Sequence, residues 1–165
     1  LPADVPSLAE AFEAAEDMGV NIEVKNLPGD PDFDDVHLVC DAVVGLAEAY
    51  RPLDRLRVSS FEIGAVDRIR VADPRLPTGW LVVERLGSGQ ILDRTLAHGH
   101  GAVHPRDDLV DEGLVVAAHE RGLEVVAWTV DDPDRIAQLA RWGVDGIITN
   151  LPAMARGVVD EVEPG

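Results

Sequence analysis

A regular alternation of strand-length and helix-length segments is the feature that most constrains the fold of this chain. Short apolar runs recur along the sequence, and amphipathic stretches of helical length separate them. After the first gap, the centres of these runs follow one another at intervals of about 21 to 24 residues, a steady β-α repeat. The predicted strands are Val20–Lys25, Leu56–Phe61, Gly79–Glu84, Gly101–His104, Leu123–Val130 and Asp145–Thr149.

This repeat predicts parallel strands joined by right-handed helical crossovers, because the runs are apolar enough to be buried on both faces. A near-constant β-α rhythm suits a (β/α)8 barrel of the TIM type better than a doubly wound sheet. The predicted fold class is therefore α/β, with six of the eight β-α units of such a barrel. No linker-like tract divides the chain, so residues 1–165 are expected to form a single domain.

Helix-end signals agree with this arrangement. Ser7 and Glu10 form a capping-box pattern (S-x-x-E) at the start of the first helical stretch. Asp107 or Asp108 is expected to open the helix before the fifth strand, and Gly122 to end it.

The charge balance excludes several classes of partner. The 165 residues include 31 acidic and 14 basic side chains, which leaves a formal net charge of −17. Nucleic acid is not expected as a partner, because its phosphates are bound by clustered Lys and Arg side chains. No apolar run approaches the roughly 18 residues of a membrane-spanning helix, so a transmembrane segment is not expected either.

The single cysteine, Cys40, lies in an apolar helical pattern and is expected to be a buried, inert thiol. One cysteine cannot form an internal disulfide, which leaves the compartment open, with the cytoplasm favoured. The chain begins at Leu1 rather than at Met, so we expect a processed or trimmed chain, or part of a longer one.

Glu23 and Lys25 are the most informative pair of polar residues. Residues two apart on a strand point to the same face, so both side chains are expected to face the barrel interior, whereas Ile22 and Val24 face the helices. One interpretation is a buried ion pair. The other is a carboxylate that ligates a hard cation, beside an ammonium group that neutralises a phosphate or an enolate. Lys25 is the only lysine of the chain, which favours the functional interpretation.

Other side chains at predicted strand ends could complete a ligand site. Phe61 and Trp128 could pack in the core or form pocket walls, and Ser60 could donate a hydrogen bond to a ligand. His104 ends the fourth predicted strand and could face the pocket. His98 and His100 precede that strand, at the opposite end, and are expected to be solvent-exposed loop residues rather than metal ligands.

Several of these segments together resemble the glycerophosphodiester phosphodiesterase family. The similarity covers essentially the whole chain, and it rests on four short motifs that are specific only in combination. The words that carry it are I-E-V-K at 22–25, S-S-F at 59–61, A-W-T-V at 127–130 and G-V-D-G-I-I-T-N at 143–150.

The resemblance implies a (β/α)8 barrel that hydrolyses glycerophosphodiesters to glycerol 3-phosphate and an alcohol, with a divalent cation, Ca²⁺ or Mg²⁺. By this resemblance Glu23 matches a carboxylate ligand of the metal, and Lys25 matches a lysine that contacts the phosphate. Phe61 and Trp128 match aromatic positions that line the substrate pocket, where Ser60 and His104 are also expected to bind substrate. The partner is then a small phosphodiester molecule.

The chain lacks the sequence motifs that carry the family's catalytic residues. The family's His-Arg-Gly word, its Glu-x-Asp pair and a following His-Asp do not occur in this sequence. Those motifs correspond to the first two strands of the barrel, so the domain is expected to lack these two strands. We therefore expect the complete enzyme to use histidines as acid and base, and this 165-residue piece alone to be inactive.

Two alternatives remain. The chain could be a degenerate barrel module that serves binding or assembly without catalysis; an intact-mass measurement on the native protein separates it from the enzyme hypothesis. A different phosphate-handling barrel would instead bind its anion at the last two strand loops. Without the two strands, Val20–Lys25 and Asp145–Thr149 form open, apolar edges, which predicts homo-oligomers through edge pairing.

Overall fold

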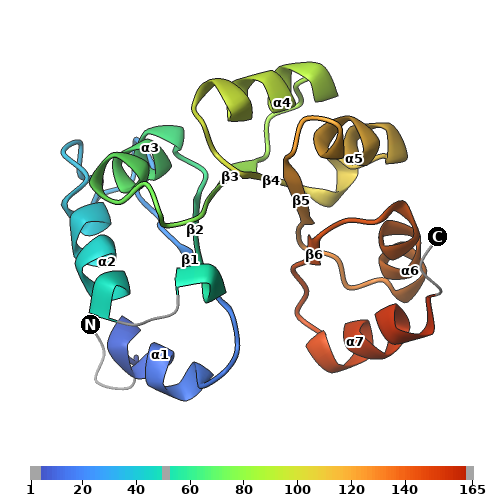
Figure 1. The fold of residues 1–165 in the computed structure, drawn as a ribbon, viewed down its shortest axis with the longest axis horizontal. Coiled ribbons are helices and arrows are strands. Elements are labelled where there is room, and N and C mark those ends of the chain that lie inside the picture. The colour runs from blue at the N-terminus through green and yellow to red at the C-terminus, as the bar shows by residue number, and fades with distance from the viewer. Residues whose placement is uncertain (1–4, 50–52, 163–165) are drawn as a thin grey trace. The chain divides into compact units, whose positions relative to one another are not determined.

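The computed structural model describes residues 5–49 and 53–162 (Figure 1). The chain divides into two compact parts, Leu1–Gly79 and Trp80–Gly165, which we call the N-terminal and the C-terminal part and describe separately. No described helix combines the length and the apolar character that a bilayer crossing requires.

The N-terminal part consists of a first helix followed by two β-α repeats. Its strands follow the order β1-β2-β3, and β1 pairs in parallel with β2, with Ile22 opposite Val58. Ser7 caps α1 through the predicted capping box, in which its side chain accepts from the Glu10 amide and the Glu10 carboxylate accepts from Ser7. The elements are α1 (Leu8–Ala15), β1 (Val20–Glu23), α2 (Leu38–Ala49), a short 3₁₀ helix (Leu53–Arg55), β2 (Leu56–Ser60), α3 (Ile63–Ala72) and the start of β3 (Thr78–Val82).

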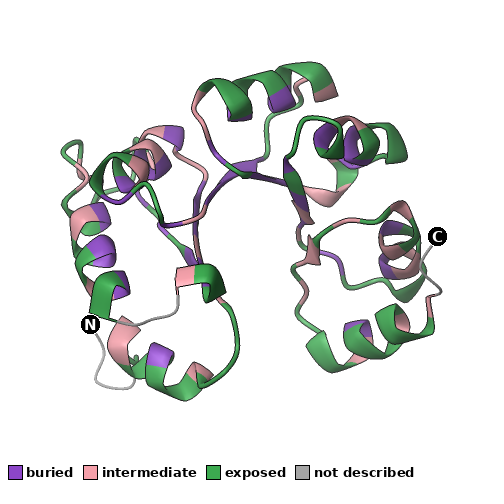
Figure 2. Ribbon diagram, viewed as in Figure 1, coloured by how far each residue is buried: buried purple, intermediate pink, exposed green. Residues whose placement is uncertain are grey.

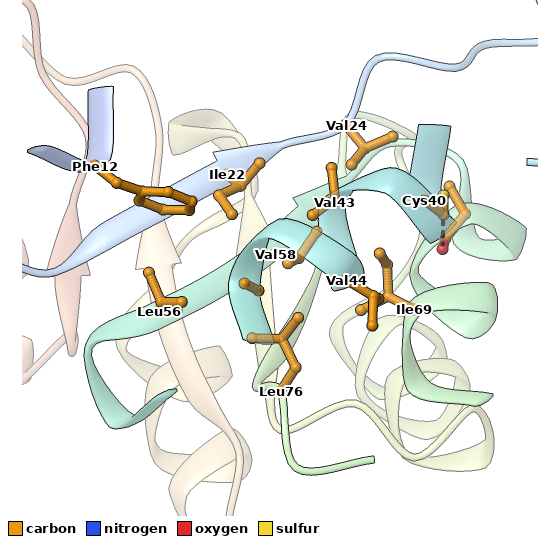
Figure 3. Packing of buried hydrophobic residues seen from close by; sticks show 12 residues of the cluster. Phe12, Ile22, Val24, Cys40, Val43, Val44, Leu56, Val58, Ile69 and Leu76 are labelled. Atoms are coloured by element: carbon orange, nitrogen blue, oxygen red, sulfur yellow. Dashed lines mark hydrogen bonds between the residues drawn. The ribbon is translucent and has the colours of Figure 1, made fainter. Parts of the chain in front are cut away.

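One hydrophobic cluster holds this part together. Ile22 and Val24 of β1 and Val58 of β2 lie with Val43 and Val44 of α2 (Figure 3). Helices α2 and α3 lie side by side over these strands (Figure 1). The apolar side of each strand is therefore covered by helices, as expected for βαβ repeats.

Cys40 lies inside the same cluster, as predicted. Its side chain is fully buried, and its Sγ donates to the carbonyl oxygen of Ala65, 3.4 Å away. Burial, with smaller contributions from the nearby carboxylates of Asp41 and Asp34, raises the pKa of the Cys40 thiol to about 11. The thiol therefore stays protonated at neutral pH, and its burial confirms that part of the expectation.

The C-terminal part continues the same pattern. Its strands follow the order β3-β4-β5-β6, and β4 pairs in parallel with β5, and β5 with β6. The elements after β3 are α4 (Ser88–Ala97), β4 (Ala102–Pro105), a short 3₁₀ helix (Asp107–Leu109), α5 (Glu112–His119), β5 (Glu124–Ala127), α6 (Pro133–Trp142), β6 (Gly146–Ile147) and α7 (Pro152–Glu161).

Burial follows the expected amphipathic pattern in both parts. Strands β2, β3 and β4 are largely buried and β1, β5 and β6 less so, and each longer helix carries buried residues on one side and exposed residues on the other (Figure 2). In the C-terminal part, Val103 and Val125 of the strands and Leu114, Ile136 and Leu139 of the helices are fully shielded from solvent. Packing of helix faces onto a parallel sheet is what stabilises these elements, because the helices are short.

The six strands lie where the apolar runs predicted them, but several boundaries were wrong. Strand β6 has two residues, Gly146 and Ile147, instead of the predicted span 145–149. Helix α5 begins later than expected, because Asp111 caps it by accepting from the Leu114 amide, and residues 107–109 form a separate 3₁₀ turn. The expectation of one domain and that of edge pairing between copies both stay predictions.

Candidate functional site

Glu23 and Lys25 share one face at the carboxyl end of β1. Ile22 and Val24, which alternate with them, are 8% and 3% exposed and pack toward α2 (Figure 3). Because side chains alternate along a strand, Glu23 and Lys25 lie on the opposite face. This is the face on which (β/α)8 proteins place their inward-pointing side chains.

The Glu23–Lys25 contact is open to solvent. The Nζ of Lys25 lies 3.9 Å from Oε1 of Glu23, and the two side chains are 76% and 37% exposed. The alternative of a buried ion pair is therefore wrong for this structure. An exposed pair at this distance contributes about 1 kcal/mol or less, so either group can exchange its partner for a ligand at little cost.

Ser60 supports this end of β1 from the neighbouring strand. Its hydroxyl donates to the Val24 carbonyl, at 2.7 Å, and accepts from the Glu62 amide, at 3.1 Å. Glu62 in turn caps α3 by accepting from the Gly64 amide, at 3.0 Å. The Val24 carbonyl, between the side chains of Glu23 and Lys25, is thus hydrogen-bonded to β2 and linked through Ser60 and Glu62 to the start of α3. Phe61 follows Ser60 directly and is half-buried.

Asn26 organises the loop that follows Lys25. It is 3% exposed, and its Oδ1 accepts from the Asp34 amide, at 2.8 Å. Its Nδ2 therefore faces the Asp34 carbonyl, at 2.7 Å, and Nδ1 of His37, at 2.8 Å. Nδ1 of His37 must accept this hydrogen bond, which places the proton of the neutral ring on Nε2.

Sequence reasoning did not single out Asn26, although a signal was present. Asn26 continues the buried register of Ile22 and Val24, and a polar residue in a buried register needs hydrogen-bond partners. The structure supplies them from Asp34 and His37, in the loop between β1 and α2.

Trp128 and His104 meet at the carboxyl ends of β4 and β5. The indole Nε1 of Trp128 donates to the His104 carbonyl, at 2.7 Å, and the Trp128 carbonyl accepts from the Asp107 amide, at 2.7 Å. Trp128 is half-buried, whereas His104 is 1% exposed. The two predicted residues therefore lie together, and the indole is held by the backbone of the neighbouring strand.

His100 was expected to be a solvent-exposed loop residue, and this prediction was wrong. His98 is half-buried, but His100 is only 2% exposed. The turn after α4 folds back on the helix, because the amides of Gly99 and His100 donate to the carbonyls of Leu96 and Thr95. This closure turns His100 inward, and the rings of His98 and His100 stack with centroids 6.1 Å apart.

Asp131 joins the loops that follow β5 and β6. Its carboxylate accepts from the Thr149 hydroxyl and from the backbone amide and side-chain amide of Asn150, each at 2.8 Å. These bonds, the Asn150 side chain first, lower the pKa of Asp131. A carboxylate at this position disfavours an anion between the last two loops, where the alternative phosphate-handling barrel would bind one.

Replacing Asp131 by Asn should loosen these loops without unfolding the chain. Because the folded-state pKa is lowered, the contribution of Asp131 is complete above its ordinary value near 3.9 and is lost as the pH falls through the folded value. We expect the protection factor of the Asn150 amide against hydrogen exchange to drop several-fold in Asp131→Asn at pH 6. The protection factor of this amide in the wild type should fall to that of the variant only at acidic pH.

Asp160→Asn, on the exposed side of α7, is the matched control and should leave the Asn150 amide unchanged. Equal protection in wild type and Asp131→Asn would contradict this role for the carboxylate.

Parallel strands, each followed by a helix, with polar side chains at their carboxyl ends, define an α/β protein of the (β/α)8-barrel type with six β-α units. Residues 1–154 match the Glycerophosphoryl diester phosphodiesterase family. The chain belongs to this family, which confirms the resemblance seen in its sequence words.

Solved structures agree with the fold. A protein from Silicibacter pomeroyi described as a glycerophosphoryl diester phosphodiesterase superposes with a TM-score of 0.82 at 28% identity, over 95% of this chain and 57% of that one. An Oleispira antarctica phosphodiesterase, solved in complex with its product sn-glycerol-3-phosphate, superposes with a TM-score of 0.81 at 24% identity, over 94% of this chain and 62% of that one.

Among sequences, a glycerophosphodiester phosphodiesterase of Caldanaerobacter subterraneus is 27% identical over 154 residues. The match covers 90% of this chain and 59% of that protein. The chain thus spans less than two thirds of the length of these relatives.

Proposed function

We propose that this chain contributes to metal-dependent hydrolysis of glycerophosphodiesters to glycerol 3-phosphate and an alcohol. Membership of the family supports the reaction class. The single structural observation that carries the proposal is the open pair of Glu23 and Lys25 at the carboxyl end of β1, where a carboxylate and an ammonium group share one face.

Glu23 fits one ligand of a divalent cation. Its carboxylate is a hard oxygen donor, partly exposed and not tied to any hydrogen-bond donor among the described residues. Ca²⁺ takes six to eight oxygen ligands, so one carboxylate is only part of a set, and Lys25 repels a cation from 3.9 Å. A bound Ca²⁺ or Mg²⁺ would neutralise charge on the phosphodiester. We therefore expect the chain alone to bind it weakly.

Lys25 supplies the positive charge for the phosphate itself. A phosphodiester carries one negative charge, and a chain with a net charge of −17 attracts it only through a local cation. Lys25 is 76% exposed and reaches solvent freely. The backbone on either side of it is held by Ser60 and Asn26, so the ammonium group starts from a fixed point.

The remaining predicted residues take roles around the substrate. Phe61 and Trp128 act as apolar walls, which exclude water from the ligand. Ser60 uses its hydroxyl on the Val24 carbonyl and the Glu62 amide, so it acts through the backbone of β1. His104 holds the Trp128 indole with its carbonyl and takes part in substrate binding through that wall.

Titration of the 165-residue chain with Ca²⁺ or Mg²⁺ tests the proposal. We expect a dissociation constant of about 1 mM or weaker, lost in Glu23→Gln because the hard oxygen anion is removed. Lys25→Gln should act in the opposite direction and tighten cation binding by up to about fivefold, because it removes a neighbouring positive charge. The same variant should weaken binding of glycerol 3-phosphate. Isothermal titration calorimetry measures the binding of the cation and of glycerol 3-phosphate to the wild type and to both variants.

Glu13→Gln, an exposed carboxylate on α1, is the matched control and should leave cation binding unchanged. Binding that survives Glu23→Gln would refute the assignment. With glycerophosphocholine and the cation present, we expect no turnover from this chain alone. Turnover that Glu23→Ala abolishes would contradict the expected inactivity of the piece and strengthen the reaction class.

A further inference from the structure

The loops after the strands hold few permanent cations. In the ranges 24–37, 61–62, 83–87, 106–111, 128–132 and 148–151, all of them described by the structure, the only Lys and Arg residues are Lys25, Arg85 and Arg106. Lys25 belongs to the function proposed above. Arg85 and Arg106 follow β3 and β4 in the C-terminal part and have no role in it.

The two arginines converge on one carboxylate. Nη2 of Arg85 and Nη2 of Arg106 each lie 2.9 Å from Oδ2 of Asp108, and Nε of Arg106 lies 2.6 Å from Oδ1. The hydrogen bonds from Arg106, with smaller contributions from the charges of both arginines, lower the pKa of Asp108, so this residue is charged at neutral pH. The trio of Arg85, Arg106 and Asp108 therefore carries one net positive charge.

This trio keeps donors available for a ligand. Within the described part of the chain, Nε and Nη1 of Arg85 and Nη1 of Arg106 contact no acceptor. The Arg85 side chain is 77% exposed and that of Arg106 is 36% exposed. Asp108 thus orients the two guanidinium groups without using all their N–H groups.

Arg135 shows the contrast between a structural arginine and this pair. Its three nitrogens donate to Asp107, to the Val110 carbonyl and to Gln138, and its guanidinium lies over the Trp142 ring, 4.9 Å from the centroid. A guanidinium satisfied in this way binds no further anion. Of the carboxylates next to the pair in the sequence, Asp107 accepts from Arg135, and Glu84 lies 3.8 Å from Arg94 on α4.

The position of the pair also suits a ligand. Arg106 lies opposite Trp128 on the neighbouring strand, and its own amide donates to the Val82 carbonyl at the end of β3. Directly opposed residues of parallel strands project to the same face, so Arg106 and Trp128 share one. The carboxyl ends of the strands are where (β/α)8 proteins bind their ligands.

We propose that Arg85 and Arg106, oriented by Asp108, form a binding site for a phosphate group at the carboxyl ends of β3 and β4, beside Trp128. A phosphate monoester presents three terminal oxygens to several N–H donors, which suits two guanidinium groups. The site lies within the C-terminal part, and its binding of the anion does not depend on the function proposed above.

Inorganic phosphate is the probe for this site. The ¹⁵N-labelled full chain is titrated at constant ionic strength and pH 7.5, and the three tryptophan indole N–H signals are followed by NMR. We expect a saturable shift of the Trp128 signal, with smaller changes at Trp80 and Trp142. Arg85→Gln should weaken the apparent affinity by about threefold to tenfold, since an exposed charge-assisted contact is lost, and the double variant with Arg106→Gln should abolish saturation.

Arg156→Gln is the matched control, because Arg156 is 78% exposed, also pairs with one aspartate and lies on α7. It should leave the saturable shift of the Trp128 signal unchanged. Three indole signals that shift alike, a shift that does not saturate, or a loss in Arg156→Gln equal to that in Arg85→Gln would overturn the site. A loss in Lys25→Gln would assign the anion to the reaction centre instead. Failure of cation binding at Glu23 leaves these outcomes unaffected.

Discussion

Replacing Asn26 by Ala is expected to lower the free energy of unfolding by about 2 to 4 kcal/mol, because it leaves buried donors and acceptors without partners. The Asn26 side chain makes three hydrogen bonds, two with the Asp34 backbone and one with Nδ1 of His37, at 2.7 to 2.8 Å. The loss should be concentrated in the loop between β1 and α2, next to Lys25. The residue therefore links stability to the proposed phosphate contact.

Hydrogen exchange measured by mass spectrometry locates this effect. Peptides that cover residues 20–49 should lose protection in Asn26→Ala, whereas tryptophan fluorescence reports on the C-terminal part, which contains all three tryptophans. Asn21→Ala is the matched control, since Asn21 is exposed and donates to one partner, Oγ of Ser59 at 2.9 Å. Equal effects of the two variants would refute the role of Asn26.

Replacing Ile69 by Ala is expected to cost about 2 to 5 kcal/mol of stability, because the change removes buried methyl groups and leaves a cavity. Ile69 lies on α3, is fully buried and belongs to the cluster formed with β1, β2 and α2 (Figure 3). The cost falls on the packing that keeps α3, and with it the Glu62 cap and Ser60, in place behind β1.

Urea denaturation followed by circular dichroism at 222 nm measures the change. Val71→Ala lies on the same helix and serves as control, because the Val71 side chain is 76% exposed. It should stay within about 0.5 kcal/mol of the wild type, as exposed substitutions do. An effect of Ile69→Ala no larger than that of Val71→Ala would show that this cluster does not govern stability.

Local patterns in the sequence were enough to place Glu23 and Lys25 on one face. Alternation along a strand depends only on the backbone geometry of neighbouring residues, so Ile22 and Val24 predict the direction of the residues between them. The helix start at Ser7 is local for the same reason, because its cap needs only an amide three residues later.

Contacts between distant residues were not accessible in this way. Arg85 and Arg106 were visible as separate arginines at strand ends, but their meeting on Asp108 depends on how β3 and β4 lie beside one another. The burial of the His100 side chain depends on the turn between α4 and β4, whose amides bind back to the end of α4. Neither is encoded in the spacing of residues along the chain.

The sequence by itself determined the number and order of the strands, the β-α repeat and the family, because these depend on hydrophobic period and on short words of residues. Only the tertiary structure decided that the Glu23–Lys25 pair is open, that Ser60 and Asn26 hold the backbone around it, and that two arginines share Asp108. The physical reason is that exposure and hydrogen-bond partnership are set by packing between segments, which periodicity within one segment does not describe.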